Sequence, residues 1–146
     1  VQTKIGVSHV TQGIKSQNAL VGGEGNGGVI YPKVGWGRDS LVGIVLALDH
    51  IAKRKKSVSE IISTYPQYTM IRDKVQVHSQ QDIAHWIETV EAKFPDTPKN
   101  REDGVKILFP DAWVHVRPSN TEPIVRIFIE APSAEEAQAL LARVKG

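Results

Sequence analysis

A polar segment of seven residues, lying between two stretches of alternating apolar residues, constrains the fold of this chain more than any other feature. Residues 113–116 and 125–129 place valine or isoleucine at every second position. That period is typical of strands with one buried face. The connecting segment, residues 117–123, is rich in Pro, Ser, Asn and Thr, as hairpin connections are. The sequence therefore predicts two neighbouring antiparallel strands joined at this segment.

The side chains of the connecting segment suit an anion. Arg117 offers a planar, permanently charged fork that can contact two phosphate oxygens at once. Prolines at both ends fix φ and would preorganise the turn before a ligand arrives. Short polar side chains and a second arginine on the outgoing strand complete the candidate phosphate site: Ser119, Asn120, Thr121 and Arg126. A plain turn ending in a solvated arginine explains the same residues without a ligand.

The rest of residues 57–146 is predicted to complete a small α+β domain. A capping-box pattern at residues 57–60 opens a short helix, and strands are expected near residues 68–77 and 105–109. Apolar residues at helical spacing predict helices over residues 83–94 and 134–144. Together these elements predict a four-stranded antiparallel sheet with helices on one face.

Residues 1–56 are predicted to be the closing portion of a layered α/β domain. A short helix is expected over residues 7–15, and a glycine-rich loop at 22–28 joins two short strands, 19–21 and 29–31. Asp39 or Ser40 caps a helix whose side chains are apolar almost all round, so this helix is expected to be buried on more than one face. The basic residues 53–56 fit the end of that helix, where cations are favourable, and mark the expected domain boundary.

The glycine-rich loop is a second candidate site. Glycines let backbone approach a sugar closely, Glu24 can accept hydrogen bonds from hydroxyls, and Asn26 can both donate and accept. A flexible hairpin is the alternative, because Gly and Asn tolerate positive φ.

The two candidate sites, in this order and separation, resemble the phosphohexomutases, the superfamily of phosphoglucomutase, phosphomannomutase and phosphoglucosamine mutase. Residues 103–123 resemble that family's C-terminal phosphate-binding region. Residues 23–28 resemble the sugar-binding loop of its third domain, often written GEMSGH. Asn26 stands where that motif has Ser, and Gly28 stands where it has His. The first change keeps hydrogen-bonding capacity and the second removes a side chain, so the pattern of sugar contacts is open.

The resemblance implies the end of the third domain, residues 1–56, followed by the mobile fourth domain, residues 57–146. The family's phosphoserine and Mg²⁺ loops do not occur in this sequence, which starts at Val1. The chain is therefore expected to be an inactive C-terminal piece of a larger cytoplasmic enzyme that interconverts hexose or hexosamine 1-phosphate and 6-phosphate. Its expected partners are those phosphosugars and the missing N-terminal domains. The loops favour the phosphoglucosamine mutase and phosphomannomutase branches.

Composition excludes several other classes of site. The chain has no Cys, and a net charge of +2 is too small to indicate nucleic acid as the general partner. No apolar run reaches membrane-spanning length. The five histidines have no spacing that suggests a metal site or a triad: His9, His50, His78, His85 and His115.

Two alternatives stay open after the resemblance. The first is a non-catalytic phosphosugar-binding or regulatory module, which the family's catalytic loops upstream in the parent gene would exclude. The second is a nucleic-acid binder, which predicts a basic sheet face bearing aromatic residues. Aromatic residues are only 6% of this sequence, and most lie on apolar stripes.

Overall fold

The computed structural model describes residues 1–77, 79–119 and 122–146. The chain divides into two compact units, Val1–Pro66 and Gln67–Gly146. The division falls after the short helix α3 (Val58–Ile62), which contacts α2 (Ser40–Arg54) of the first unit. The capping box predicted for α3 is present, with Ser57 and Glu60 bonding reciprocally.

The second unit is built on an antiparallel sheet of five strands, in the order β3-β7-β6-β5-β4. The strands are β3 (Thr69–Gln76), β4 (Lys99–Asn100), β5 (Val105–Leu108), β6 (Trp113–Pro118) and β7 (Ile124–Ala131). The predicted strand pair around the polar segment is β6 and β7. The prediction of four strands was wrong, because β4 is a two-residue edge strand of polar residues and carries no apolar period.

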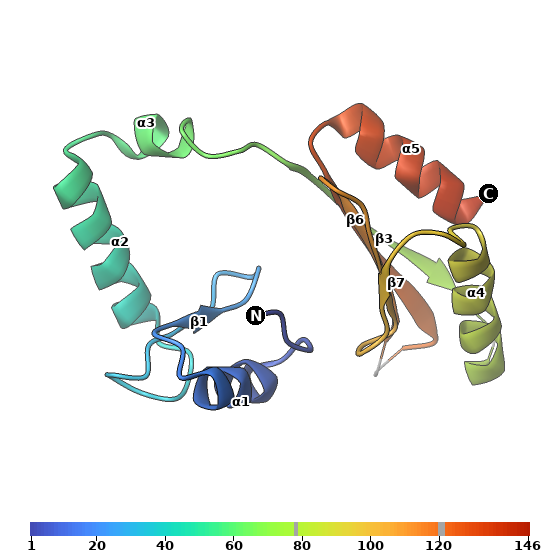
Figure 1. The fold of residues 1–146 in the computed structure, drawn as a ribbon, viewed down its shortest axis with the longest axis horizontal. Helices are drawn as coiled ribbons and strands as arrows, with labels where there is room; N and C mark the ends of the chain where they lie inside the picture. The colour runs from blue at the N-terminus through green and yellow to red at the C-terminus, as the bar shows by residue number, and fades with distance from the viewer. Residues whose placement is uncertain (78, 120–121) are drawn as a thin grey trace. The chain divides into compact units, whose positions relative to one another are not determined.

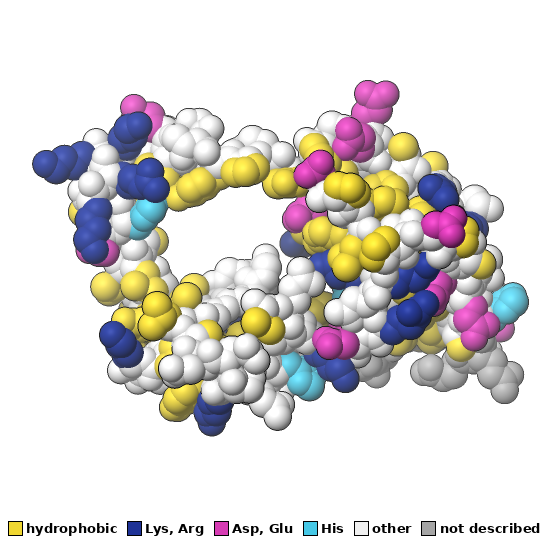
Figure 2. Space-filling view, in the orientation of Figure 1, with side chains coloured by type: hydrophobic (Ala, Val, Ile, Leu, Met, Phe, Trp, Pro, Cys, Tyr) yellow, Lys and Arg dark blue, Asp and Glu magenta, His cyan; other side chains and the backbone are white. Residues whose placement is uncertain are grey.

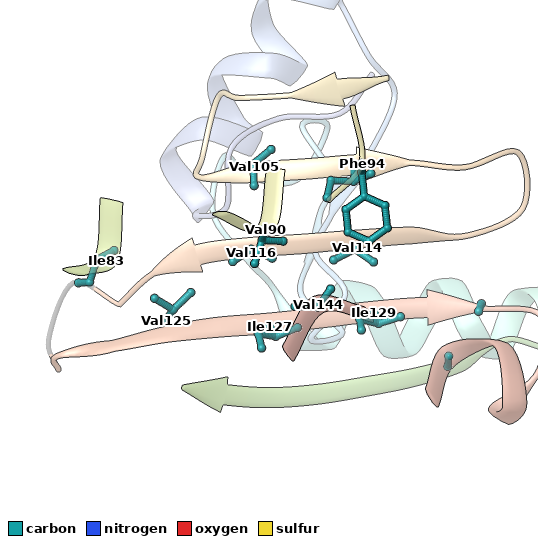
Figure 3. Packing of buried hydrophobic residues seen from close by; sticks show 13 residues of the cluster. Ile83, Val90, Phe94, Val105, Val114, Val116, Val125, Ile127, Ile129 and Val144 are labelled. Carbon is teal, nitrogen blue, oxygen red and sulfur yellow. The ribbon is translucent and has the colours of Figure 1, made fainter. Parts of the chain in front are cut away.

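Both helices of the second unit, α4 (Gln80–Ala92) and α5 (Ala134–Lys145), lie on one side of the sheet (Figure 1). Alternate strand residues pack against them in one core, which includes Val116 of β6 and Ile127 and Ile129 of β7. Val90 of α4, Phe94 just beyond it and Val144 of α5 lie over these strands (Figure 3). The opposite face of the sheet has no helix over it in the described part of this unit.

The first unit is small and has a minor core. It contains α1 (Val7–Gln17), the antiparallel pair β1 (Gly22–Gly23) and β2 (Val29–Ile30), α2 and α3. Its buried cluster consists of Val10, Ile14 and Ile30. The bounds predicted for the first strand, 19–21, were wrong: Leu20 and Val21 are exposed, and the pairing begins at Gly22.

The α2 helix begins at the predicted position, but it is more exposed than predicted. Asp39 caps it by accepting hydrogen bonds from the amides of Leu41 and Val42. No residue of α2 is buried, and Leu41 is 72% exposed. The prediction of burial on more than one face was therefore wrong for this chain, because the first unit offers few buried residues as a packing layer: Val10, Ile14, Ile30 and Ile61. Lys and Arg side chains gather where α2 ends, as the basic cluster predicts (Figure 2).

Candidate functional site

A row of three cations crosses the uncovered face of the sheet beside the β6–β7 connection. The strand register places Arg117 opposite Arg126, and Arg126 opposite Lys74 of β3. Their sequence neighbours Val116 and Ile127 belong to the core on the helix side, so these three side chains lie on the other face. Like charges directly opposite one another in a sheet are destabilising. The row therefore concentrates positive charge, which the carboxylates of Asp103 and Glu122 offset in part.

Arg117 is held at one end of this row. Its side chain is only 15% exposed, and its Nη1 donates a hydrogen bond of 2.9 Å to Oδ2 of Asp103. The Nε atom of Arg117 is buried and has no hydrogen-bond partner among residues 1–77, 79–119 and 122–146. The position of the guanidinium thus depends on Asp103, a residue to which the sequence interpretation gave no role.

Asp103 is brought to Arg117 by a glycine with a left-handed backbone. Gly104 has φ of +68°, and a Cβ placed there would lie 2.2 Å from the carbonyl oxygen of Val116. It would also lie 2.8 Å from Cα of Arg117. Only glycine allows the chain to enter β5 this close to β6. The Asp103 carboxylate therefore lies next to Arg117 because residue 104 has no side chain.

Arg126 connects the row to the polar segment. Its Nη2 donates to Oγ of Ser119 at 3.3 Å and lies 3.5 Å from Oε2 of Glu122. Ser119 is 4% exposed, and its amide donates to the Ile124 carbonyl at 3.0 Å. Arg117, Ser119 and Arg126 thus meet at the ends of β6 and β7. The other two predicted phosphate ligands, Asn120 and Thr121, lie outside the described residues.

An open depression of about 510 Å³ lies on this face, next to Arg126. Sequence reasoning missed Arg72 and Lys74, which contribute to it from β3. The sequence feature that could have indicated them is the alternation of charged and apolar residues along that strand. The depression is lined by Arg72, Asp73, Lys74, Glu122, Ile124, Arg126 and Phe128.

His115 lies on the same face, one position along β6 from Val116. Burial lowers the pKa of its imidazole, and the hydrogen bond to the Asp103 carbonyl partly opposes that shift. The His115 Nε2 atom lies 2.6 Å from that carbonyl oxygen, which can only accept, so Nε2 carries the hydrogen. His115 therefore donates a hydrogen bond to the main chain of Asp103 and helps to fix its position.

The aromatic residues of the uncovered face bear on the nucleic-acid alternative. Trp113 and Phe128 lie on it. Trp113 is already engaged, because Lys106 Nζ lies 4.2 Å from its ring centroid and its Nε1 donates to Glu130 at 3.0 Å. A ring covered in this way is not the open stacking platform that single-stranded nucleic acid requires.

In the first unit, the predicted sugar-binding residues are partly engaged within their own loop. Oε1 of Glu24 accepts from the amide of Gly6 at 3.2 Å, and Oε2 lies 3.7 Å from Nη1 of Arg38. Oδ1 of Asn26 accepts from the amide of Gly28 at 3.0 Å. A Cβ at Gly28 would lie 2.5 Å from Cδ of Arg38, so a glycine there accommodates the arginine side chain. The sequence interpretation did not assign Arg38 to this site.

The described residues contain no group of three or more His, Asp or Glu side chains that could hold a metal ion. His78 lies outside that part of the chain. Among the helices that the structure describes, none has the length and apolar character needed to cross a membrane.

The chain is similar over nearly all its length to known enzymes. Residues 1–68 match the alpha/beta/alpha domain III of phosphoglucomutase/phosphomannomutase, and residues 73–146 match the C-terminal domain. A phosphoglucomutase/phosphomannomutase of Thermococcus kodakarensis is 38% identical over 97% of this chain and 31% of its own length. A phosphoglucosamine/phosphogalactosamine mutase of Sulfurisphaera tokodaii is 32% identical over 98% of this chain and 32% of its own length.

The fold is also similar to a solved structure. A phosphoglucomutase/phosphomannomutase family protein of Burkholderia thailandensis superposes with a TM-score of 0.75 at 23% identity. The alignment covers 98% of this chain and 31% of that protein. The chain thus spans about a third of the length of the relatives it matches.

Proposed function

Because this chain belongs to the phosphoglucomutase/phosphomannomutase family, we propose that it is the substrate-binding C-terminal region of a phosphohexomutase. The parent reaction interconverts the 1-phosphate and 6-phosphate of a hexose or hexosamine through a bisphosphate. The names of the Thermococcus and Sulfurisphaera relatives support this substrate class. Phosphoglucosamine mutase and phosphomannomutase remain the favoured branches on the form of the two loops.

The observation that carries the proposal is the row of cations beside the polar segment. Arg117, Arg126 and Lys74 lie on adjacent strands in direct register, where like charges repel one another. The carboxylates of Asp103 and Glu122 offset part of that repulsion. A phosphate dianion relieves that repulsion and accepts charge-assisted hydrogen bonds from the guanidinium groups. Ser119, which Arg126 contacts, adds a hydroxyl at the start of the segment. Asn120 and Thr121 complete the proposed phosphate ligands.

This chain's task in the reaction is to hold the phosphate that is not being transferred. A phosphoserine and Mg²⁺ bound outside these residues supply the transfer chemistry in the parent enzyme. Phosphoryl transfer depends mainly on positioning and charge stabilisation, so a rigid anchor for the second phosphate contributes directly to the rate. The same anchor serves both orientations of the bisphosphate, since either phosphate fits it.

The glycine-rich loop is proposed to contact the sugar. Asn26 is exposed and Glu24 is 13% exposed, and both have oxygen acceptors for hydroxyls. Their internal bonds to Gly28 and Gly6 fix their orientation. Arg38 lies beside Glu24, with its Nη1 atom 3.7 Å from Oε2 of that carboxylate. Hydroxyls that exchange places when the sugar turns meet the same two side chains.

The proposal predicts that this 146-residue chain binds hexose phosphates but does not interconvert them. Glucosamine 1-phosphate and mannose 1-phosphate should bind with dissociation constants in the millimolar range, because only the phosphate anchor and part of the sugar site are present. Calorimetric or NMR titration measures the binding, and a coupled assay for the 6-phosphates measures turnover. Activity restored by joining the chain to the preceding domains would separate the enzyme from a non-catalytic module. Turnover by the chain alone would contradict the assignment of the chemistry to other domains.

A second prediction concerns Lys74, the cation contributed by β3. Lys74→Gln should weaken binding of inorganic phosphate by roughly 3- to 10-fold, because an exposed charge contact contributes about 1 kcal/mol. The loss should shrink as ionic strength rises. Lys53→Gln, on the exposed end of α2, removes the same charge from the other unit and serves as the matched control. Equal effects of the two variants would show that Lys74 acts only through net charge.

A further inference from the structure

Asp103 is negatively charged, and an anion site needs positive charge. Its carboxylate bonds to Arg117, the arginine proposed to grip phosphate, so it lies close to the position of a bound anion. Two negative charges at such distances repel, which on its own would weaken binding.

We propose that Asp103 is a positioning residue, which orients the guanidinium of Arg117 for phosphate. This inference rests on the proposed function of Arg117 as the phosphate anchor. The contact uses one Nη1 hydrogen and leaves the Nη2 hydrogens and the other Nη1 hydrogen for a ligand. A long arginine side chain loses rotamer freedom on binding, and a guanidinium that is already fixed loses less.

The surroundings of Asp103 support a fixed orientation. The Asp103 side chain is 29% exposed, that of Arg117 is 15% exposed, and the Nη1 to Oδ2 distance is 2.9 Å. Two further constraints fix the main chain of Asp103: the His115 hydrogen bond to its carbonyl and the close approach at Gly104. The main chain of Asp103 is therefore fixed to the sheet, so its carboxylate offers Arg117 a stationary hydrogen-bond acceptor.

The burial of Arg117 Nε points the same way. Burying an N–H donor without a hydrogen-bond partner is unfavourable. The described residues give this Nε no partner and give Nη1 the bond to Asp103. Asp103 thus contributes a contact that holds the guanidinium.

The two effects of Asp103 on phosphate have opposite signs, and this makes the inference testable. If Asp103 acts only as a negative charge, then neutralising it strengthens phosphate binding. If it orients Arg117, then neutralising or removing it weakens binding despite the more positive site. If the ion pair is purely structural, then removing Asp103 lowers the free energy of unfolding and leaves the phosphate affinity of the folded protein unchanged or higher.

The experiment compares Asp103→Asn and Asp103→Ala in the 146-residue chain, titrated with inorganic phosphate. The alanine variant should raise the dissociation constant by about 5-fold or more, and the asparagine variant by less, because its amide oxygen keeps a weaker, uncharged bond to Arg117. Glu102→Gln is the matched control, since Glu102 is an exposed neighbouring acid. Its loss should leave the affinity unchanged or slightly higher. A dissociation constant that falls in both Asp103 variants would overturn the inference.

A second measurement requires no ligand. It tests the positioning role of Asp103 separately from the proposed phosphate binding by Arg117. The ¹⁵N Nε–H signal of Arg117, assigned by its absence in Arg117→Lys, should be sharp and protected from exchange in the parent chain. In Asp103→Ala it should move to the position of exposed arginines and exchange rapidly. An unchanged signal would show that Asp103 does not fix the guanidinium. Failure of the parent chain to bind phosphate would count against the phosphate anchor, and this signal would still decide the positioning role.

Discussion

Replacing Arg117 by alanine is expected to lower kcat/KM of the full-length parent enzyme by about 100- to 1,000-fold. The change removes two charge-assisted hydrogen bonds to phosphate, together worth about 3–4 kcal/mol, and each 1.36 kcal/mol is tenfold in rate. Arg117→Lys keeps the charge and loses the planar fork, so it should cost about 1–3 kcal/mol of transition-state stabilisation. The measurement is steady-state kinetics with a hexose 1-phosphate, accompanied by circular dichroism to establish intact folding.

The competing interpretation of Arg117 gives a different result for the same two variants. A surface arginine at a strand end tolerates replacement within about 0.5 kcal/mol, with no kinetic effect. Arg126→Gln is the informative companion, because Arg126 lies opposite Arg117 and contacts Ser119. If Arg117→Lys keeps the parent's kcat/KM and Arg126→Gln does not, the phosphate lies nearer β7, and the anchor must be reassigned.

The local part of the phosphate site was predictable from sequence. Alternating valine and isoleucine residues fix which face of β6 and β7 is buried, and the short connection fixes their pairing. The sequence therefore predicted that Arg117 and Arg126 lie near the same turn. Lys74 could not be assigned, because the register of β3 against β7 depends on packing between residues about 50 positions apart.

Asp103 shows a different limit of sequence analysis. Its position in the motif was noted, but only the structure gives its distance to Arg117. A carboxylate near a proposed anion site would not be sought from charge arguments, because it has the unfavourable sign. The signal that could have found it is the following glycine, since Gly104 marks a backbone position that needs positive φ or close approach.

The first unit shows what an apolar pattern alone can establish. The side chains of α2 predict a helix that requires burial, and the helix forms over the predicted residues with the predicted cap. The pattern does not say which layer covers it, and the unit's own core of Val10, Ile14 and Ile30 leaves Leu41 and Leu48 exposed. Helix formation is specified locally here, whereas burial is not.

Replacing Gly104 by alanine is expected to destabilise the second unit by about 3 kcal/mol or more. Left-handed backbone costs a residue with a Cβ about 1–2 kcal/mol, and the clash with the Val116 carbonyl must be relieved by moving β5 away from β6. Chemical denaturation followed by fluorescence of Trp86 and Trp113, both in this unit, measures the loss. Gly35→Ala is the control, because nothing lies within 4 Å of a Cβ there.

A further variant separates the two causes and connects stability to the site. Asparagine adopts positive φ more readily than alanine but also has a Cβ. If Gly104→Asn is more stable than Gly104→Ala, the difference in free energy of unfolding measures the backbone strain. The stability that Gly104→Asn still lacks relative to the parent chain measures the clash. In both variants the displaced Asp103 should release Arg117 and weaken phosphate binding in the protein that remains folded. A loss below about 1 kcal/mol in Gly104→Ala would mean that β5 and β6 adjust easily at this point. In that case the close approach at Gly104 would not be what holds Asp103 against Arg117.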